Sequence, residues 1–318
     1  MAYPRLSDHP DYTRSGARFI PEIWSGKILI KFYDATCLSE ISNTDYEGEI
    51  KKYGDTVIIR TVAPITMSKY VVGQKLNKER PVSTPTSLSI DQGYYWDVIL
   101  DDVMDVQSDL NLLDRWTDEA GRQQKITLET DIFNQWFGYA GTTAATMGQV
   151  HAYNTGLTAG VKSLGYNIGA YGSPVTFDKG NVLDYIIDAE SVLAEQNVPN
   201  DRMWMIIPVW MAGLIKKSDL KNASITGDSV SVLRNGRIGE IDMFALYVSN
   251  LLPTVSDGGI TTTSIPFGHP FGPSFAAQLT ETETLRSHDE FGDEVRGLII
   301  FGAKILKTEA VGVLYGHK

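Results

Sequence analysis

The chain has 318 residues, which corresponds to about two domains of typical size. Hydrophobic residues make up 42% and charged residues 21% of it, a globular mixture that excludes a largely disordered protein. The formal net charge of −11 argues against a protein that grips nucleic acid through its phosphates, because such proteins usually carry a basic face. Cys37 is the only cysteine, so a disulfide framework within one chain is excluded, as is a zinc site that needs several thiolates.

The N-terminal stretch, residues 1–49, begins as an extended polar arm with three prolines and lacks the apolar segment of a signal peptide. The longest strongly apolar run, residues 203–215, is shorter than the roughly 20 residues needed to span a bilayer. We therefore expect a soluble protein that is made in a cytoplasm. The arm has few apolar anchors of its own, so we expect a neighbouring chain to hold it.

Residues 53–90 are predicted to form a long two-stranded excursion. A β-rich run at 56–62 and a second run at 65–72 lead to Gly73, and the chain then returns toward residue 90. Its tip is basic, with Lys75, Lys78 and Arg80. An isolated two-stranded hairpin is marginal in water, so we expect this one to lie on something else.

Residues 94–100 alternate in a pattern typical of a strand, and the period then changes. Apolar residues recur at three- and four-residue steps across 103–137, which predicts one long helix. Four aromatic side chains fall at helical spacing there and are predicted to lie in the core: Trp116, Phe133, Trp136 and Phe137.

The second half of the chain mixes helices and strands without regular βαβ alternation, which favours an α+β fold over a doubly wound sheet. An amphipathic helix is predicted from residue 182 to just before Pro199, and a second helix at 208–217. The predicted strands are 203–207, two within 236–250, 274–279, 295–301, 304–306 and 311–315.

Motifs for phosphate loops, dinucleotide binding, hydrolase nucleophiles and zinc sites are absent, so no cofactor is predicted. The best candidate for metal or acid–base chemistry is an acidic group: Asp97, Asp101, Asp102, Asp105 and Asp109. On a helix, Asp101, Asp105 and Asp109 would share one face, which could contribute to a Mg²⁺ or Ca²⁺ site. The same pattern also fits the solvated face of a helix with acids near its N-terminus, and we favour that interpretation.

Two further features have an ordinary and a functional interpretation. The basic tip at Lys75, Lys78 and Arg80 could bind phosphate, but a charge run at a hairpin tip is more often simply solvated. Cys37 is better explained as a small buried side chain than as a nucleophile, since no histidine lies near it in the sequence.

The order of these parts resembles the tailed-bacteriophage major capsid proteins of the Hong Kong 97-type fold. Three stretches carry the resemblance. The first is Phe19-Ile20-Pro21-Glu22-Ile23-Trp24-Ser25 with Asp45-Tyr46-Glu47-Gly48-Glu49-Ile50 and Tyr53-Gly54-Asp55-Thr56-Val57. The second is Arg234-Asn235-Gly236-Arg237-Ile238-Gly239-Glu240-Ile241, followed by residues 244–250, with Met243 where the family usually has glycine. The third is Phe275-Ala276-Ala277-Gln278 with the closing strands from Val295 to Tyr315.

The resemblance implies an N-terminal arm at 1–49, an E-loop at 50–92, a P domain with spine helix at 93–174, an A domain at 175–250 and a return to the P domain at 251–318. It implies a structural protein, not an enzyme, that self-assembles into hexamers and pentamers of an icosahedral head. That head would enclose double-stranded DNA without sequence-specific binding, as part of a virion assembled in the host cytoplasm. The expected partners are further copies of the chain, a separate scaffolding protein, a portal protein and, as an option, a decoration or cement protein.

A charge-pairing hypothesis follows for the contacts between subunits. The basic tip of the excursion would lie over the acidic stretch Asp101, Asp105 and Asp109 of an adjacent subunit, and Trp24 of the arm is a further contact candidate. Three alternatives stay open at this point. They are a nanocompartment shell protein of the same fold, a metal-dependent α+β enzyme that uses the acidic group between Asp97 and Asp109, and another virion component.

Overall fold

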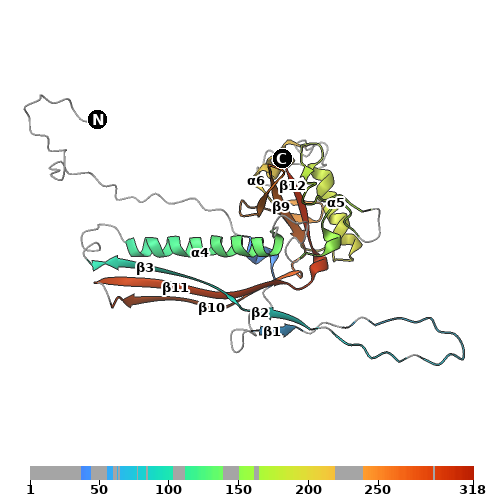
Figure 1. Cartoon of the computed structure of the whole chain (residues 1–318), viewed down its shortest axis with the longest axis horizontal. Helices are drawn as coiled ribbons and strands as arrows, with labels where there is room; N and C mark the ends of the chain where they lie inside the picture. Colours follow the sequence, from blue (N-terminus) through green and yellow to red (C-terminus); the bar gives the residue numbers. More distant parts are fainter. Residues whose placement is uncertain are drawn as a thin grey trace, which may run out of the picture.

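The computed structural model describes residues 37–43, 56–59, 63, 65–76, 78–83, 85–102, 112–138, 150–160, 165–218, 239–288 and 291–318. Within these residues the chain forms an elongated layer, a compact lobe at one end of it and a thin ribbon that projects from beneath (Figure 1). No described helix combines the length and the hydropathy needed to cross a membrane.

The elongated layer is a three-stranded antiparallel sheet covered by one long helix. The sheet has the order β10-β11-β3. Its strands are β3 (Gln92–Asp101), β10 (Pro273–Arg286) and β11 (Gly292–Ile305), and the helix that lies along it is α4 (Leu112–Phe137) (Figure 1). Alternation along β3 leaves every second residue exposed, as expected for a strand with one covered face.

The predictions for this layer are partly confirmed. The strand at 94–100 and the long helix are present, and the described helix begins at Leu112; residues 103–111 lie outside the described part. The prediction of separate strands at 295–301 and 304–306 was wrong, because β11 runs without a break through Gly302. This glycine is a point of close approach: a Cβ there would lie 2.2 Å from the backbone oxygen of Ser89.

The compact lobe is built on a sheet with the path β4-β12-β9-β5-β7-β6, and β8 pairs with β9. Two helices, α5 (Val182–Glu195) and α6 (Val209–Lys217), pack against it, both close to their predicted bounds. The strands are β4 (Val175–Thr176), β5 (Met203–Ile207), β6 (Glu240–Ile241), β7 (Phe244–Val248), β8 (Thr254–Asp257), β9 (Ile260–Gly268) and β12 (Val311–His317). The chain therefore leaves this lobe after β9, forms the hairpin β10–β11, and returns as β12.

A shared core joins the lobe to the elongated layer. Phe133, Trp136 and Phe137 on the last turns of α4 are fully buried, as the helical spacing predicted, whereas Trp116 is only partly buried. Their cluster includes Trp204 and Tyr315 from the compact lobe and further side chains of β11. Burial of this many large side chains fixes the two parts against each other.

The described N-terminal segment is tied to this core. Helix α1 (Leu38–Ile41) begins after Cys37, whose backbone N–H donates to both carboxylate oxygens of the buried Glu129 on α4, at 3.1 and 3.0 Å. The Cys37 thiol also donates to Glu129 Oε1, at 3.3 Å. Cys37 is therefore a small buried side chain, as predicted.

The ribbon starts from two short antiparallel strands, β1 (Thr56–Ile59) and β2 (Thr86–Ser89). Leu88 is buried and packs with Ala276 of β10, and the Lys304 ammonium donates to the Ser87 carbonyl at 2.8 Å. The base of the ribbon is thereby fastened to the sheet. Two short 3-10 helices complete the described elements, η1 (Ala152–Asn154) and η3 (Thr308–Ala310).

Candidate functional site

The outer part of the ribbon exposes apolar side chains that the subunit does not cover. Every described residue from 65 to 83 is exposed, and the side chains of Met67 and Val72 are 93% and 91% exposed. Five other large apolar side chains of this segment are also mostly exposed: Ile65, Tyr70, Val71, Leu76 and Val82. A concentration of uncovered apolar side chains on a projecting element is typical of an interaction site.

The ribbon turns at Val72 and Gly73. The Gln74 backbone N–H donates to the Val71 carbonyl at 3.0 Å, and Gly73 has a positive φ of 87°, a conformation that favours glycine. The three basic candidates Lys75, Lys78 and Arg80 follow this turn on the returning limb, all exposed. Within the described residues no ion pair involves any of them.

The acidic candidates do not form one helical face, so that expectation was wrong for Asp101. Asp97 and Asp101 lie in strand β3, where Asp97 is opposite Arg296 and Asp101 is opposite Gly292 on β11. Long-range sheet pairing decides the structure here, and it overrides a spacing of four residues that would suit a helix. Asp105, Asp109 and Trp24 lie outside the described residues.

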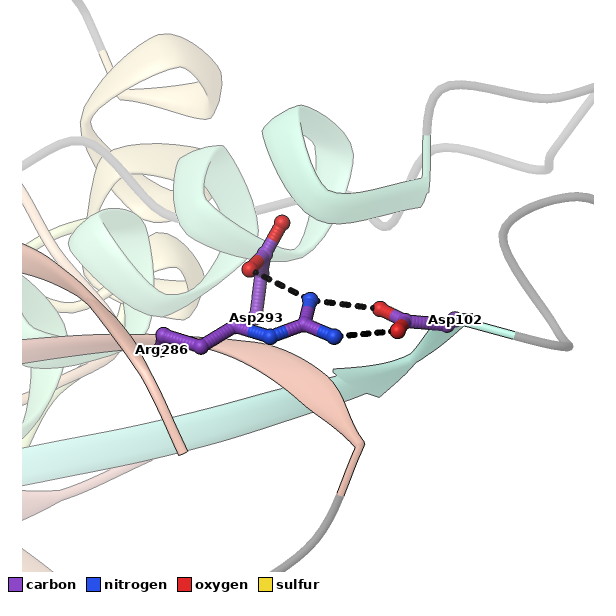
Figure 2. A network of polar contacts seen from close by, with 3 residues as sticks. All are labelled: Asp102, Arg286 and Asp293. Carbon is purple, nitrogen blue, oxygen red and sulfur yellow. Dashed lines mark hydrogen bonds and ion pairs between the residues drawn. The ribbon is translucent and has the colours of Figure 1, made fainter. Parts of the chain in front are cut away.

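A cluster of charged side chains joins the distal ends of the three strands of the elongated sheet. Both terminal nitrogens of Arg286, at the end of β10, donate to the Asp102 carboxylate, and one of them, Nη1, also donates to Asp293 Oδ1 at 3.1 Å (Figure 2). The Arg286 hydrogen bond holds the pKa of Asp102 below its usual range. We call this group the Arg286 clasp. It fixes the point at which the chain leaves β3.

A second ion pair lies farther along the sheet. Arg296 donates to Glu283 Oε2 from Nε at 3.1 Å and from a terminal nitrogen at 2.7 Å. Glu283, Arg296 and Asp97 occupy matching positions on the three adjacent strands, so one cation stands between two acids. These three residues and Tyr95 help to line an open depression of about 370 Å³.

The metal-dependent alternative finds no support in the described geometry. In this part of the chain no group of three or more His, Cys, Asp or Glu side chains is placed to hold a metal ion. Asp102 is engaged by Arg286, and Asp97 is opposite Arg296. A carboxylate that is already paired with a guanidinium is a poor ligand for a divalent cation.

Two titratable groups that the sequence analysis did not single out have displaced pKa values. The hydrogen bond between Glu190 on α5 and Asp242 in the β6–β7 turn raises the pKa of Glu190 to about 7. Burial lowers the pKa of His269, whose Nδ1 accepts the Phe271 backbone N–H at 3.2 Å. Glu190 and Asp242 are far apart in the sequence, so no local signal identifies the pair.

Comparison with known proteins gives a consistent result. A protein-family model described as phage capsid protein matches residues 88–315. Among solved structures, the chain is similar to one from Mycobacterium phage Che8, with 26% sequence identity, a TM-score of 0.73 and coverage of 93% of this chain and 96% of that chain. No curated protein sequence matches the chain.

Two more distant structures share the fold. The capsid structure of the cyanophage P-SCSP1u has 12% identity, a TM-score of 0.69 and full coverage of both chains. The mature capsid of bacteriophage PhiM1 has 15% identity, a TM-score of 0.65 and 98% coverage of each chain. The mixed α and β fold with its long helix is thus that of phage capsid subunits. Since the family model spans well over half of the chain, this protein belongs to the phage capsid protein family and is a structural major capsid protein.

Proposed function

We propose that this capsid protein forms hexamers and pentamers that close into the icosahedral head of a tailed phage, around double-stranded DNA. The observation that supports this proposal is the exposure of the ribbon, because the single subunit leaves the Met67 and Val72 side chains almost entirely in contact with water. A closed shell of identical subunits is built from repeated heterologous contacts, in which a projecting element of one copy is covered by the next. In such a shell the ribbon would lose its contact with water.

The charge of the chain fits the inner wall of a DNA container. A net charge of −11 per subunit repels the phosphate backbone, so the wall would confine the genome without adhering to it. This supports enclosure of DNA without sequence-specific binding. The role is structural, and we propose no enzymatic activity.

We propose that the basic tip of the ribbon lies over the acidic stretch of an adjacent subunit. The described tip carries Lys75, Lys78 and Arg80, and the acids opposite them would be Asp101 together with Asp105 and Asp109. Exposed pairs of this kind contribute about 0–1 kcal/mol each. Repeated around a shell, they would set the register of neighbours and the rate at which these associate. Trp24 of the arm is proposed as a further contact between subunits.

Charge reversal tests the pairing. We expect the double change Lys75→Glu and Lys78→Glu to impair assembly, and the reversal of Asp101, Asp105 and Asp109 to lysine to restore it in that background. Lys179→Glu, on the exposed surface of the compact lobe, is the matched control and should assemble normally. Normal assembly of the doubly reversed protein would refute the pairing.

The remaining partners and the domain division are also proposals. We propose a separate scaffolding protein, a portal protein, an optional decoration protein, and assembly in the host cytoplasm. We divide the chain into an arm (1–49), an E-loop (50–92), a P domain (93–174), an A domain (175–250) and a return (251–318). This division follows the order of segments along the chain. It separates strands of one sheet, since β9 and β12 pair in the same sheet as β5.

Electron microscopy of the purified product tests the central proposal. The protein is expressed alone and together with its neighbouring genes, and both preparations are imaged. We expect round particles of uniform size, tens of nanometres wide, in at least the second preparation. Small oligomers in both preparations would contradict the assignment as a shell-forming subunit.

A further inference from the structure

The two limbs of the ribbon keep one register over their whole described length, although the outer part forms no backbone ladder. In the β1–β2 pair, Thr56 is opposite Ser89 and Ile59 is opposite Thr86, so the numbers of the paired residues always add up to 145. The described residues from 65 to 83 belong to no strand. Regular pairing alone therefore fixes only the base of the ribbon.

Contacts farther out fall in the same register. The Thr66 backbone N–H donates to Glu79 Oε2 at 3.1 Å, and the Thr66 hydroxyl donates to Glu79 Oε1 at 3.3 Å. At the tip, the Val71 N–H donates to Gln74 Oε1 at 3.3 Å and the Gln74 N–H donates to the Val71 carbonyl. The residue numbers of both pairs again add up to 145.

Residue 79 lies between the β1–β2 pair and the Val71–Gln74 turn, and a glutamate there is well suited to hold the two limbs in register. Its two carboxylate oxygens accept both Thr66 donors at once, and hydrogen bonds to an ionised acceptor are stronger than neutral ones. Its neighbours along the limb, Lys78 and Arg80, are basic, so Glu79 is the acidic exception in the tip. The two bonds define which residue of one limb stands opposite which residue of the other.

We propose that Glu79 is a positioning residue that holds the limbs in this register, so that they close into a continuous antiparallel ladder when the ribbon docks on a second copy. A slip of one residue would turn every side chain to the opposite side of the ribbon. The apolar residues Ile65, Met67 and Val71 of the outgoing limb would then no longer share a side with Leu76 and Val82 of the returning limb. The docking part rests on the proposed function, whereas the register is a property of the subunit itself.

Pairs of introduced cysteines measure the register directly, because the native Cys37 is buried and is the only other thiol. Met67→Cys with Lys78→Cys is in register. Met67→Cys with Arg80→Cys is shifted by two residues and keeps the same side of the ribbon. A disulfide needs Cα atoms within about 7 Å, and two residues of extended chain add roughly 6.6 Å.

We expect the in-register pair to oxidise at least about tenfold faster than the shifted pair in unassembled subunits. Equal rates, or a faster shifted pair, would overturn the register. Glu79→Ala should slow the in-register pair about threefold to tenfold, and Glu79→Gln, which keeps one acceptor oxygen, should restore part of the rate. If Glu79→Gln is as slow as Glu79→Ala, the hydrogen bonds accepted from Thr66 do not hold the register and the positioning role is wrong.

Assembly of the crosslinked proteins tests docking separately. We expect subunits locked in register to form particles as well as the same cysteine variant does when reduced, and subunits locked two residues out of register to form few or none compared with their own reduced form. Particle formation by both would overturn the docking part and leave the register intact. If the chain forms no particles in any condition, it is the proposed function that fails, while the oxidation rates still report the register.

Discussion

In the compact lobe the large apolar side chains of β5 and the Ile265 and Phe267 side chains of β9 are buried, whereas in the ribbon Met67 and Val72 are almost fully exposed. The lobe satisfies its hydrophobic residues within one chain, through a sheet covered by α5 and α6. The ribbon has the same kinds of side chain and no second layer. The lobe therefore completes its folding within the subunit, whereas burial of the ribbon needs another molecule.

The largest expected effect comes from a truncation inside the lobe. Phe267→Ala removes a ring that is fully buried against Phe244 and should lower the free energy of unfolding by about 3–5 kcal/mol. Urea unfolding of the unassembled subunit measures it. A loss below about 1 kcal/mol would mean that the lobe is not the tightly packed body described above.

The matched change in the ribbon should act on assembly alone. Met67→Asp with Val72→Asp places charges on two exposed sites, so we expect the free energy of unfolding to change by less than about 0.5 kcal/mol and particle formation to be lost. Urea unfolding and electron microscopy of the same preparation separate the two effects. Normal particles from this variant would remove the distinction between lobe and ribbon.

The lobe should also lose stability as the pH rises through neutrality. The folded-state pKa of Glu190, about 7, lies above its ordinary value, so its contribution is complete below about pH 4.5 and is lost as the pH rises through 7. Because the side chain is partly exposed, we expect a loss on the order of 1 kcal/mol. Glu190→Gln keeps a hydrogen-bond donor toward Asp242 and should flatten this dependence.

Thermal unfolding between pH 5 and pH 8 checks the effect. Glu309→Gln, an exposed carboxyl of the same lobe, is the control and should leave the slope unchanged. An unchanged slope in Glu190→Gln would show that the Glu190–Asp242 contact does not form in solution.

The smallest effect is expected at the Arg286 clasp, which lies in the elongated layer and belongs neither to the compact lobe nor to the ribbon. All three side chains are about half exposed, so solvent and salt screen their attraction. Arg286→Gln should lower the melting temperature of the subunit by no more than about 2 °C, and the difference should vanish at high salt. A larger, salt-independent drop would show that the clasp supports packing beyond its charges.

Several features were predictable because they depend on local pattern. The helices α5 and α6 and the strand β5 are close to their expected bounds, since the helices have a clear apolar period and β5 is a short continuous apolar run. Strand β9 was missed. Its sequence is rich in threonine and contains Pro266, yet from Thr262 onward it is buried on both faces, and the Thr262 hydroxyl donates to the Val255 carbonyl at 3.0 Å.

The acidic candidates also show that sequence spacing does not predict contacts between distant segments. Sequence spacing suggested a helical face for Asp101, but pairing with Gly292 across the sheet places it in a strand. The partners of the acids, such as Arg286 for Asp102, come from segments far away in the chain. The spacing of residues describes only neighbours along one helix or strand. It therefore identified these acids as candidates but could not predict which residues they contact.

Composition, period and motif are enough to predict most element types, the exposed basic tip, the single buried cysteine and the resemblance to phage capsid subunits. Three-dimensional contacts are needed to see that β12 returns to the sheet of β5, that Gly302 lets β2 approach β11, and that Thr66 stands opposite Glu79. These are pairings between distant segments. Such pairings are selected by the shared burial and hydrogen bonding of the whole chain, which no local window contains.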